Sequence, residues 1–412
     1  MKKYKILTGL TLISLIAVFM LSCGGGSNQI TLRWWHFWTD PVIKPVIDKM
    51  ITDYEMANPG VKIEQTGLTW ANGHEKIVIA FSSGTSPDIV ELGSDWVAEF
   101  SYSGNLTSIT EAVKNDTAQF LGWTPGIYND SIYAFPWILG TRVLFLNRDL
   151  LTQAGFDEKF IPYNWDDLKQ ACFAIHDLAD DIYGFGSNAA EKHRLYKKVL
   201  PFFWALDGRI VSQNGKYAVF SSDKTYKALE YYKSLHDSCS IVDTQRRLED
   251  AFLDGKIGVI ISGDWLLKRI RNENRDINFF TTLIPGPEYP GKSFVGGEYL
   301  AVSKTSPHKD EAIKFIKYIT STENQLIFCK ANYTANPSSR EATRDEFFDN
   351  DPDLQVFIRQ LELSRMTTPT PNWVYIEDII ETSIEEILFN EAPIAETIYE
   401  ANARIQELIK DR

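Results

Sequence analysis

The sequence predicts a globular α/β protein with two domains. The chain has 412 residues, which is too long for one ordinary hydrophobic core and fits two domains of common size. Its hydrophobic fraction of 44% and charged fraction of 24% are typical of a soluble folded protein. From residue 30 onward, β-type runs alternate with amphipathic helical patterns. This alternation favours parallel sheets that are covered by helices on both faces.

The first part of the chain follows a regular strand–helix rhythm. Three strands are predicted from apolar runs, at 30–35, 61–65 and 88–92. Between the first two, apolar residues recur at helical spacing from Val46 to Tyr54, and the Asn-Pro-Gly turn that ends at Gly60 stops this helix. The apolar residues at 77–81 predict another helix, which ends at Gly84.

The same rhythm continues to the C-terminus. Buried strands are predicted at 142–146 and 258–261. Asn164 is a typical N-cap for a helix over 165–178, and an apolar stripe predicts a helix over 312–319. The last stretch, 376–408, has helical patterning with no strand signal. Since no long Pro- or Gly-rich linker is present, we expect short segments to join the two domains.

The first 23 residues have the features of an export signal. Three lysines precede an apolar stretch at 6–21, and Ser22-Cys23 follows it. The end of the stretch is similar to a lipoprotein cleavage site, although only Ser22 of the residues before the cysteine is small. A membrane anchor is the alternative, but the stretch is at the short limit for a span. We predict a signal peptide at 1–22, a tether at 23–29 that is lipid-anchored through Cys23, and a position at the cell membrane, periplasmic or on the cell surface.

Charge and residue spacing narrow the classes of partner. The formal net charge is −13, and removal of 1–22 makes it more negative by three, so nucleic acid is not an expected partner. The six His and the Cys residues have no metal-ligand spacing, so neither a metal nor a cofactor is predicted. Two alternatives stay open for the cysteines beyond Cys23: Cys172 and Cys239 pair, or these two and Cys329 are buried thiols.

Several motifs occur in the order found in one known family. They are WWHFW at 34–38, NPGVKI at 58–63, SPDIVEL at 86–92 followed by Asp95-Trp96 and GNL at 104–106, YAFP at 133–136 with LNRDLL at 146–151, AFLDGK at 251–256 with GDW at 263–265, FVGGEYLAVS at 294–303, and AIKFIKYIT at 312–320. In these motifs the chain resembles the extracellular solute-binding proteins of bacterial ABC sugar importers, the maltose-binding-protein-like family. The resemblance runs from about residue 30 to the C-terminus.

The resemblance implies a fold and a way of working. The family fold is of the periplasmic-binding-protein type II: two doubly wound lobes are joined by three crossings, and the solute lies between them. Carried over, the first lobe takes 30–141 and 293–325, and the second takes 142–292 and 326–412. The lobes are expected to close on the solute by a hinge motion, and the closed monomer is expected to deliver it to the transmembrane subunits of an ABC permease.

A sugar needs flat aromatic faces for its C–H surface and polar groups for its hydroxyls. In open α/β sheets such groups follow the carboxyl ends of strands. Asp95-Trp96 and Gly263-Asp264-Trp265 follow predicted strands and supply both kinds of group. The candidate ligand-binding residues are Trp38, Asp40, Trp70, Asp95, Trp96, Arg142, Trp204, Gly263, Asp264, Trp265, Gly297, Glu298, Tyr333 and Trp373.

These candidates have different origins. Asp95 falls on an acidic sugar contact of the family, whereas Trp96 replaces a basic one, and Trp204, Tyr333 and Trp373 are placed near the ligand by the resemblance alone. An acid such as Asp95 also stabilises a helix start with no ligand. Arg142 is either a ligand contact or an inter-lobe salt bridge, and the sequence leaves that open.

Two other functions remain as alternatives. A glycosidase could use two carboxylates such as Asp95 and Asp264, but the chain has no GxSxG, HExxH, P-loop or dinucleotide-binding motif, so we expect no enzyme. A polyamine or another non-sugar solute could occupy the same fold, since aromatic rings and acids also bind cations. The sequence does not identify the solute.

Overall fold

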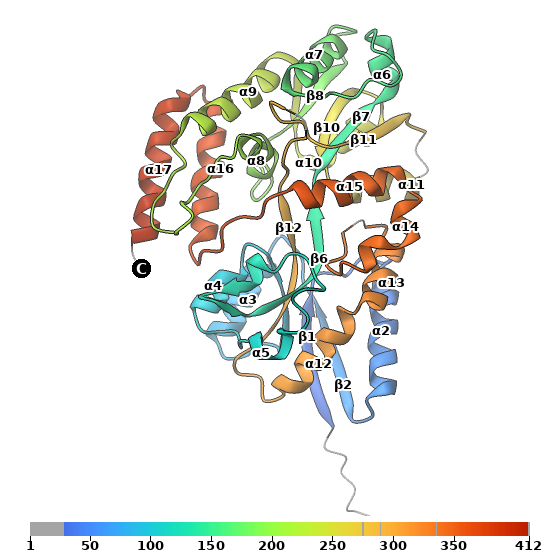
Figure 1. Cartoon of the computed structure of the whole chain (residues 1–412), viewed down its shortest axis with the longest axis vertical. Coiled ribbons are helices and arrows are strands. Elements are labelled where there is room, and N and C mark those ends of the chain that lie inside the picture. Colours follow the sequence, from blue (N-terminus) through green and yellow to red (C-terminus); the bar gives the residue numbers. More distant parts are fainter. Residues whose placement is uncertain (1–28, 274–275, 289, 335, 411–412) are drawn as a thin grey trace, which may run out of the picture.

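Two five-stranded β-sheets organise the chain, one in each of two lobes that follow one another along the long axis (Figure 1). The computed structural model describes residues 29–273, 276–288, 290–334 and 336–410. The predicted signal peptide and Cys23 lie outside these residues. None of the described helices is long and apolar enough to cross a membrane.

The first sheet has the strand order β2-β1-β3-β12-β6. Its strands are β1 (Ile30–His36), β2 (Val61–Gly67), β3 (Ile89–Gly93), β6 (Ala134–Thr141) and β12 (Val295–Val302). β1 pairs in parallel with β2 and β3, whereas β12 is antiparallel to its neighbours β3 and β6. The runs predicted at 30–35, 61–65 and 88–92 correspond to β1, β2 and β3.

Helices and a small hairpin complete the first lobe. The helices are α2 (Lys44–Ala57), α3 (Gly73–Ser82), α4 (Val97–Tyr102), α5 (Thr110–Val113), α12 (Lys309–Ile319) and α13 (Thr322–Asn332), with the 3-10 turn η1 (Thr124–Gly126) and the hairpin strands β4 (Ile127–Tyr128) and β5 (Ser131–Ile132). α2 buries Ile47, Met50, Ile51 and Tyr54, the apolar face that the sequence pattern predicts. α12 and α13 pack against α2, so α13 lies with the first sheet although the predicted division assigns 326 onward to the second lobe. The lobe boundaries stay a prediction.

The second sheet has the strand order β11-β7-β10-β8-β9. Its strands are β7 (Val143–Asn147), β8 (Tyr183–Asn188), β9 (Ser240–Asp243), β10 (Ile257–Ser262) and β11 (Phe279–Thr282). β8 is parallel to both β9 and β10, whereas β7 is antiparallel to β10 and β11. Each sheet is therefore parallel, as the strand–helix alternation predicts, except for one antiparallel strand, β12 or β7. β7 follows β6 almost directly into the second lobe and β12 returns from it, so neither has the helical crossover that parallel neighbours need.

The second lobe is the more helical one. Its helices are α6 (Arg148–Gln153), α7 (Trp165–His176), α8 (Tyr196–Ala205), α9 (Asp223–Cys239), α10 (Gln245–Leu253), α11 (Asp264–Asn272), α15 (Pro352–Leu363), α16 (Trp373–Phe389) and α17 (Ile394–Lys410), and η2 (Ala342–Arg344) and α14 (Glu346–Asp349) precede α15. The predicted N-cap of α7 is confirmed, because the Asn164 side chain accepts a hydrogen bond from the backbone N–H of Asp167. The helical stretch predicted at 376–408 is two helices, separated where Glu391 takes a positive φ of 56°.

The chain passes between the lobes at three places, as the family fold requires. Arg142 alone separates β6 from β7, the chain returns from β11 to β12, and it passes again from α13 to α15, which packs against β7 and β11. Arg142 is therefore held between the two sheets by the backbone on both sides.

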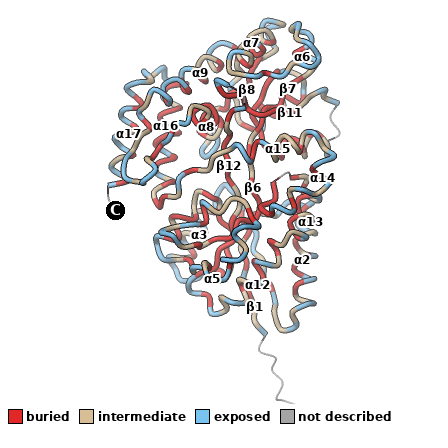
Figure 2. Tube along the Cα trace, viewed as in Figure 1, coloured by how far each residue is buried: buried red, intermediate tan, exposed pale blue. Residues whose placement is uncertain are grey.

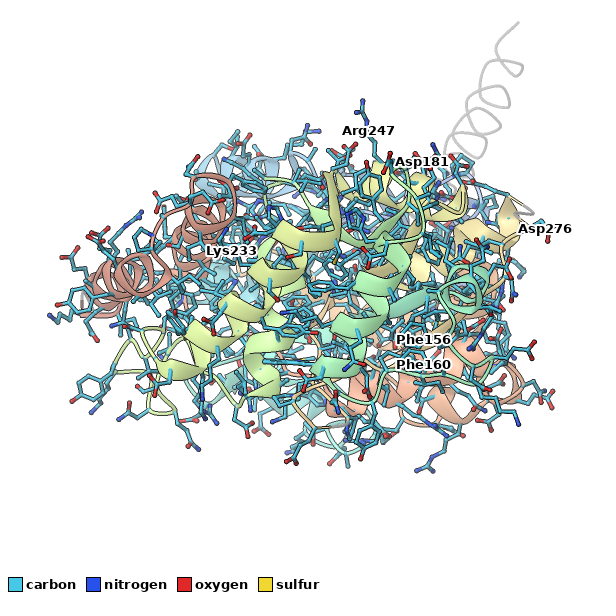
Figure 3. The ribbon with its side chains drawn as sticks, turned by 90° about the horizontal axis from the view of Figure 1, so that it is seen from above. Phe156, Phe160, Asp181, Lys233, Arg247 and Asp276 are labelled. Atoms are coloured by element: carbon cyan, nitrogen blue, oxygen red, sulfur yellow. The ribbon has the colours of Figure 1, made fainter. Side chains whose placement is uncertain are left out.

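Hydrophobic residues fill the interior of both lobes, and the tube in Figure 2 is buried mainly along the sheets and the inner faces of the helices. Charged side chains such as Asp181, Arg247 and Asp276 point outward in Figure 3, where α16 and α17 project to one side of the second lobe. Cys172, Cys239 and Cys329 are buried free thiols. Of the two alternatives for the cysteines, the structure has the thiols.

Candidate functional site

The same dipeptide, Asp-Trp, follows a central strand in each lobe. Asp95-Trp96 comes two residues after the end of β3, at the entry to α4, and Asp264-Trp265 comes directly after the β10–Gly263 junction and begins α11. Both pairs therefore lie beyond the carboxyl end of a strand, where open α/β sheets place ligand-contacting groups. The two pairs have different surroundings.

Asp95 connects three segments of the chain. Its Oδ1 accepts a hydrogen bond from Thr367 Oγ1 at 2.9 Å, and its Oδ2 lies 3.5 Å from Lys197 Nζ on α8 of the second lobe. The side chains of Lys197 and Asp95 are only 16% and 10% exposed, so this ion pair is largely shielded from water. Asp95 thus joins the carboxyl end of β3 in the first sheet to the second lobe.

Trp96 belongs to an aromatic group in the first lobe. The group consists of Trp96, Trp70, Phe37 and His74: Trp70 stacks on Phe37 with ring centroids 4.1 Å apart, and Trp96 lies 5.5 Å from Trp70 and 5.1 Å from His74. Trp70 is 47% exposed, and Trp96 is partly exposed. Gly93 lies beneath the two tryptophan rings, since a Cβ there would be 3.5 Å from both. The group offers an aromatic surface to water or to a ligand.

Trp265 is held by hydrogen bonding as well as by packing. Its indole N–H donates to Glu249 Oε1 at 2.6 Å, and Glu249 is a buried residue of α10. Its ring folds back over Gly263, where the Cβ of any other residue would overlap it. The glycine at 263 therefore makes room for the Trp265 ring.

Arg142 lies between aromatic rings at the junction of the two lobes. Its guanidinium carbon is 4.7 Å from the centroid of Phe294 and 5.4 Å from that of Trp265. Removal from water lowers the pKa of Arg142 to about 10, although the nearby Tyr196, Asp95 and Asp264 oppose this shift. Arg142 therefore stays charged at neutral pH and contacts rings from the second lobe and the return crossing.

Two lysines of α8 lie beside Arg142. Lys197 Nζ is 5.1 Å from the Phe294 centroid, and Lys198 Nζ is 5.9 Å from the Trp265 centroid. Lys198 is buried and donates to the carbonyl of Ile261 at 2.7 Å, and burial lowers the pKa of its ammonium well below the usual range. Sequence analysis missed both lysines, because nothing in the α8 sequence indicates that its first turn meets Asp95 and the end of β10.

Two acidic residues at this junction, Glu298 and Glu91, have raised pKa values. Burial, and then the charge of Asp264, raise the pKa of Glu298 to about 8. Glu91 on β3 is fully buried; this burial and the neighbouring Glu298 raise its pKa well above the usual range, and its Oε2 accepts the backbone N–H of Phe37 at 3.0 Å. Asp264 accepts a hydrogen bond from Thr334 and lies 3.5 Å from the Asn336 side-chain nitrogen. Asp264 is thus joined to the segment that follows α13.

The charged candidates are the ones that the structure brings together. Burial lowers the pKa of Arg142, and the negative charges of Asp95 and Asp264 oppose this fall. Burial raises the pKa of Glu298, and the positive charges of Arg142 and Lys197 oppose this rise. Trp265 is joined to this group through its contact with Arg142. The candidate site is therefore centred on Arg142, at the boundary of the two lobes.

Other predicted residues have structural partners. Trp38 is partly buried, with its ring edge-on to Trp137 and Phe328, and Asp40 accepts backbone N–H groups at the start of α2 and lies 3.9 Å from Lys268 of α11. A Cβ on Gly297 would come within 2.7 Å of the Ile138 carbonyl oxygen, so this glycine permits the close pairing of β12 with β6.

The three candidates placed by resemblance alone lie at different depths. Trp204 is 3% exposed and stacks on Phe294 with a 10° interplanar angle, and Trp373 is 1% exposed at the start of α16. Tyr333 ends α13 in the left-handed conformation, donates to Asp351, and has the Arg271 guanidinium 4.1 Å from its ring centroid. Only Tyr333 of the three is partly exposed.

Comparison of the sequence with models of known protein families identifies the family of this chain. The family model of the bacterial extracellular solute-binding proteins matches residues 40–326. The chain belongs to this family. The resemblance drawn from its ordered motifs is thereby confirmed, and so is the two-lobed fold that the resemblance implied.

The relatives compared below are distant in sequence but match nearly the whole of this solute-binding protein. A putative binding protein of Brucella abortus is 24% identical, with 99% of each chain covered. The solved structure of the sugar-binding protein MalE from Xanthomonas citri is 24% identical with a TM-score of 0.82, covering 93% of this chain and 98% of that one. A solute-binding protein of Thermotoga lettingae solved with α-D-tagatose is 23% identical with a TM-score of 0.81, covering 92% and 100%.

Proposed function

We propose that this solute-binding protein captures a sugar or oligosaccharide between its lobes and delivers it to an ABC permease. The observation that carries the proposal is the meeting of Asp95, from the first lobe, with Asp264 and Trp265, from the second lobe, around Arg142. Asp95 is in ion-pair distance of Lys197 across the lobe boundary, and Arg142 lies against Trp265. A solute at this boundary contacts both lobes at once, so its binding favours the closed arrangement over an open one.

The residue types suit a saccharide. The partly exposed rings of Trp265, Trp96 and Trp70 provide flat surfaces for C–H groups, and Asp95, Glu298 and Arg142 provide acceptors and donors for hydroxyls. Glu298 adds a further property, because a carboxyl with a pKa of about 8 is largely protonated at neutral pH and can donate a hydrogen bond. The Xanthomonas citri protein is named a sugar-binding protein, and the Thermotoga lettingae protein was solved with α-D-tagatose. Both support a saccharide as the ligand.

The remaining parts of the proposal concern the cell. We propose that residues 1–22 direct export, that a lipid on Cys23 holds the chain at the membrane through the 23–29 tether, and that the protein works as a monomer. Metabolic labelling with a radioactive fatty acid tests the anchor: we expect label in the wild type and none in Cys23→Ser, and an unlabelled wild type contradicts it.

Thermal unfolding of residues 24–412 in the presence of single solutes tests the binding function. The panel contains tagatose, maltose, maltotriose, mannobiose and diacetylchitobiose, with spermidine and glycerol phosphate as non-sugar solutes. Because a ligand that binds only the native state stabilises it, we expect a rise in melting temperature with at least one saccharide. A shift with spermidine alone overturns the carbohydrate assignment, and hydrolysis of an oligosaccharide overturns the proposal that the protein binds without catalysis.

A further inference from the structure

We infer that Glu249 is a positioning residue, which fixes the plane of the Trp265 ring at the lobe boundary. The inference rests on the proposed function in one respect: Trp265 is taken as a surface on which the solute stacks. Glu249 itself is 3% exposed and lies beneath the site, on α10. It therefore acts on a solute only through Trp265.

The Glu249 carboxylate has an unusual concentration of donors. Its Oε1 accepts from Trp265 Nε1 at 2.6 Å, Gln245 Nε2 at 2.7 Å and Ser262 Oγ at 2.9 Å, and its Oε2 accepts from Arg269 Nη1 at 3.0 Å. These donors come from α10, the end of β10 and α11. Bonds to an ionised acceptor are stronger than neutral ones and hold their donors in fixed directions. One carboxylate thus ties the indole to the strand and the helix on either side of it.

The ring is constrained on a second side. Its six-membered ring packs over Gly263, while the N–H at its other edge points to Glu249. A ring fixed at both edges keeps one orientation. The Trp265 side chain therefore loses no further conformational freedom when a solute stacks on it. Trp96 in the first lobe is held by ring contacts with Trp70, Phe37 and His74, and Ser94 occupies the position that Gly263 has before Trp265.

A purely structural role for Glu249 makes a different prediction. If the carboxylate served only as the partner of Arg269, the contact with Oε2 would matter and the one with Oε1 would not. Arg269 also pairs with Asp250 at 2.5 Å and Glu273 at 3.1 Å, so it has other acceptors. Glu249→Gln removes the charge from both oxygens, whereas Arg269→Gln, the matched control, removes only the ion-pair partner of Oε2, so the difference between the two variants reports the Trp265 side.

The experiment uses residues 24–412 with ¹⁵N-labelled tryptophan. The indole resonance of Trp265 is assigned by its absence in Trp265→Phe. In Glu249→Gln we expect this resonance to move and its proton to exchange faster with water, because the charged acceptor is gone; in Arg269→Gln we expect it to stay. For the panel saccharide with the largest melting shift, we expect the Kd to rise about tenfold in Glu249→Gln and less than about threefold in Arg269→Gln.

Two results overturn the inference. One is an unchanged Trp265 resonance in Glu249→Gln, and the other is a Kd that rises no more in Glu249→Gln than in Arg269→Gln. In the Trp265→Phe background, Glu249→Gln should change the Kd no further, since the N–H through which it acts is absent. Failure of the proposed function gives a different pattern: no panel saccharide binds the wild type, while the resonance in Glu249→Gln still moves and so still supports the hold of Glu249 on the ring.

Discussion

The two Asp-Trp pairs differ in what holds each residue. In the first lobe the acid is the connected partner: Asp95 reaches Thr367 and Lys197, while Trp96 is packed only among other rings. In the second lobe the tryptophan is hydrogen-bonded to Glu249 and folded over Gly263, and Asp264 is joined to the segment after α13. The same dipeptide after the same kind of strand therefore has two environments: the tryptophan is held by ring packing in the first lobe and by packing and a hydrogen bond in the second.

On the proposed function, we infer from this difference a division of roles between the lobes. The first-lobe rings, with Trp70 47% exposed, can adjust to the outline of a solute, whereas Trp265 presents one prepared surface. A prepared surface contributes more to affinity, because less conformational freedom is lost on binding. The predictions below follow from this division, from the largest expected effect to the smallest.

Removal of the two tryptophans should have unequal effects on affinity. We expect Trp265→Ala to weaken binding of the panel saccharide by about 100-fold and Trp96→Ala by about tenfold, because a fixed, partly buried aromatic ring dominates a binding surface. Calorimetric titration measures both, and circular dichroism checks that each variant is folded. Equal losses in the two variants would contradict the division of roles.

Replacing the glycine that precedes each Asp-Trp pair with alanine should change the free energy of unfolding by unequal amounts. Gly263→Ala places a Cβ inside the space of the Trp265 ring, so we expect the free energy of unfolding to fall by about 2 kcal/mol. Gly93→Ala is the matched control, since its Cβ would lie at an ordinary contact distance of 3.5 Å from Trp70 and Trp96, and we expect a change within about 0.5 kcal/mol. Urea unfolding of both variants tests this pair, and a destabilised Gly93→Ala with an unaffected Gly263→Ala would reverse the comparison.

The Asp95–Lys197 ion pair should couple the effects of mutations at these two residues on saccharide binding. We expect Asp95→Asn and Lys197→Met each to weaken saccharide binding by about fivefold, and the double variant to weaken it by less than the product, because one shared contact is lost. Four titrations complete the cycle. Strictly additive losses would show that Asp95 and Lys197 act independently.

The two acids should also differ in their effect on Glu298. Burial, and then the charge of Asp264, raise the pKa of Glu298 from 4.5 to about 8, and Asp95 is not among the main causes. Because the folded pKa is above the unfolded one, the folded state retains a proton that the unfolded state releases, so this group lowers stability as pH rises from about 4.5 to 8. We expect Asp264→Asn to lower the pKa of Glu298 and narrow that window, and Asp95→Asn to leave it unchanged. Carbon-13 titration of the Glu298 carboxyl measures the pKa, and a pKa that falls only in Asp95→Asn would contradict the assignment.

Local patterns predicted much of the fold. The strands at 30–35, 61–65 and 88–92, the helix from Val46 to Tyr54 and the Asn164 cap are all encoded by neighbouring residues. β8 was not predicted, because Gly184 and Gly186 in its sequence indicate a loop. Gly184 is required by packing, since a Cβ there would overlap the backbone carbonyl of Cys172 on α7. The reversal of β7 and β12 also depends on the path of the chain between lobes and leaves no mark on an apolar run.

The candidate site was predictable in its strand ends and not in their supports. Asp95, Trp96, Asp264 and Trp265 follow strands and could be found from that position alone. Glu249, Lys197 and Thr367 lie on helices or connecting segments that contact these residues only in the folded molecule. Their roles depend on which helix face meets the site, and side-chain patterning does not specify that.

The most direct test of the central claim is calorimetric titration of residues 24–412 with the saccharide panel, repeated with Trp265→Ala and Trp96→Ala. We expect saturable binding of at least one saccharide by the wild type, loss of that binding in Trp265→Ala, and a smaller loss in Trp96→Ala. Saccharide binding that persists unchanged in both variants would show that the solute does not lie between the two Asp-Trp pairs. Absence of binding to every saccharide would contradict the proposed function itself.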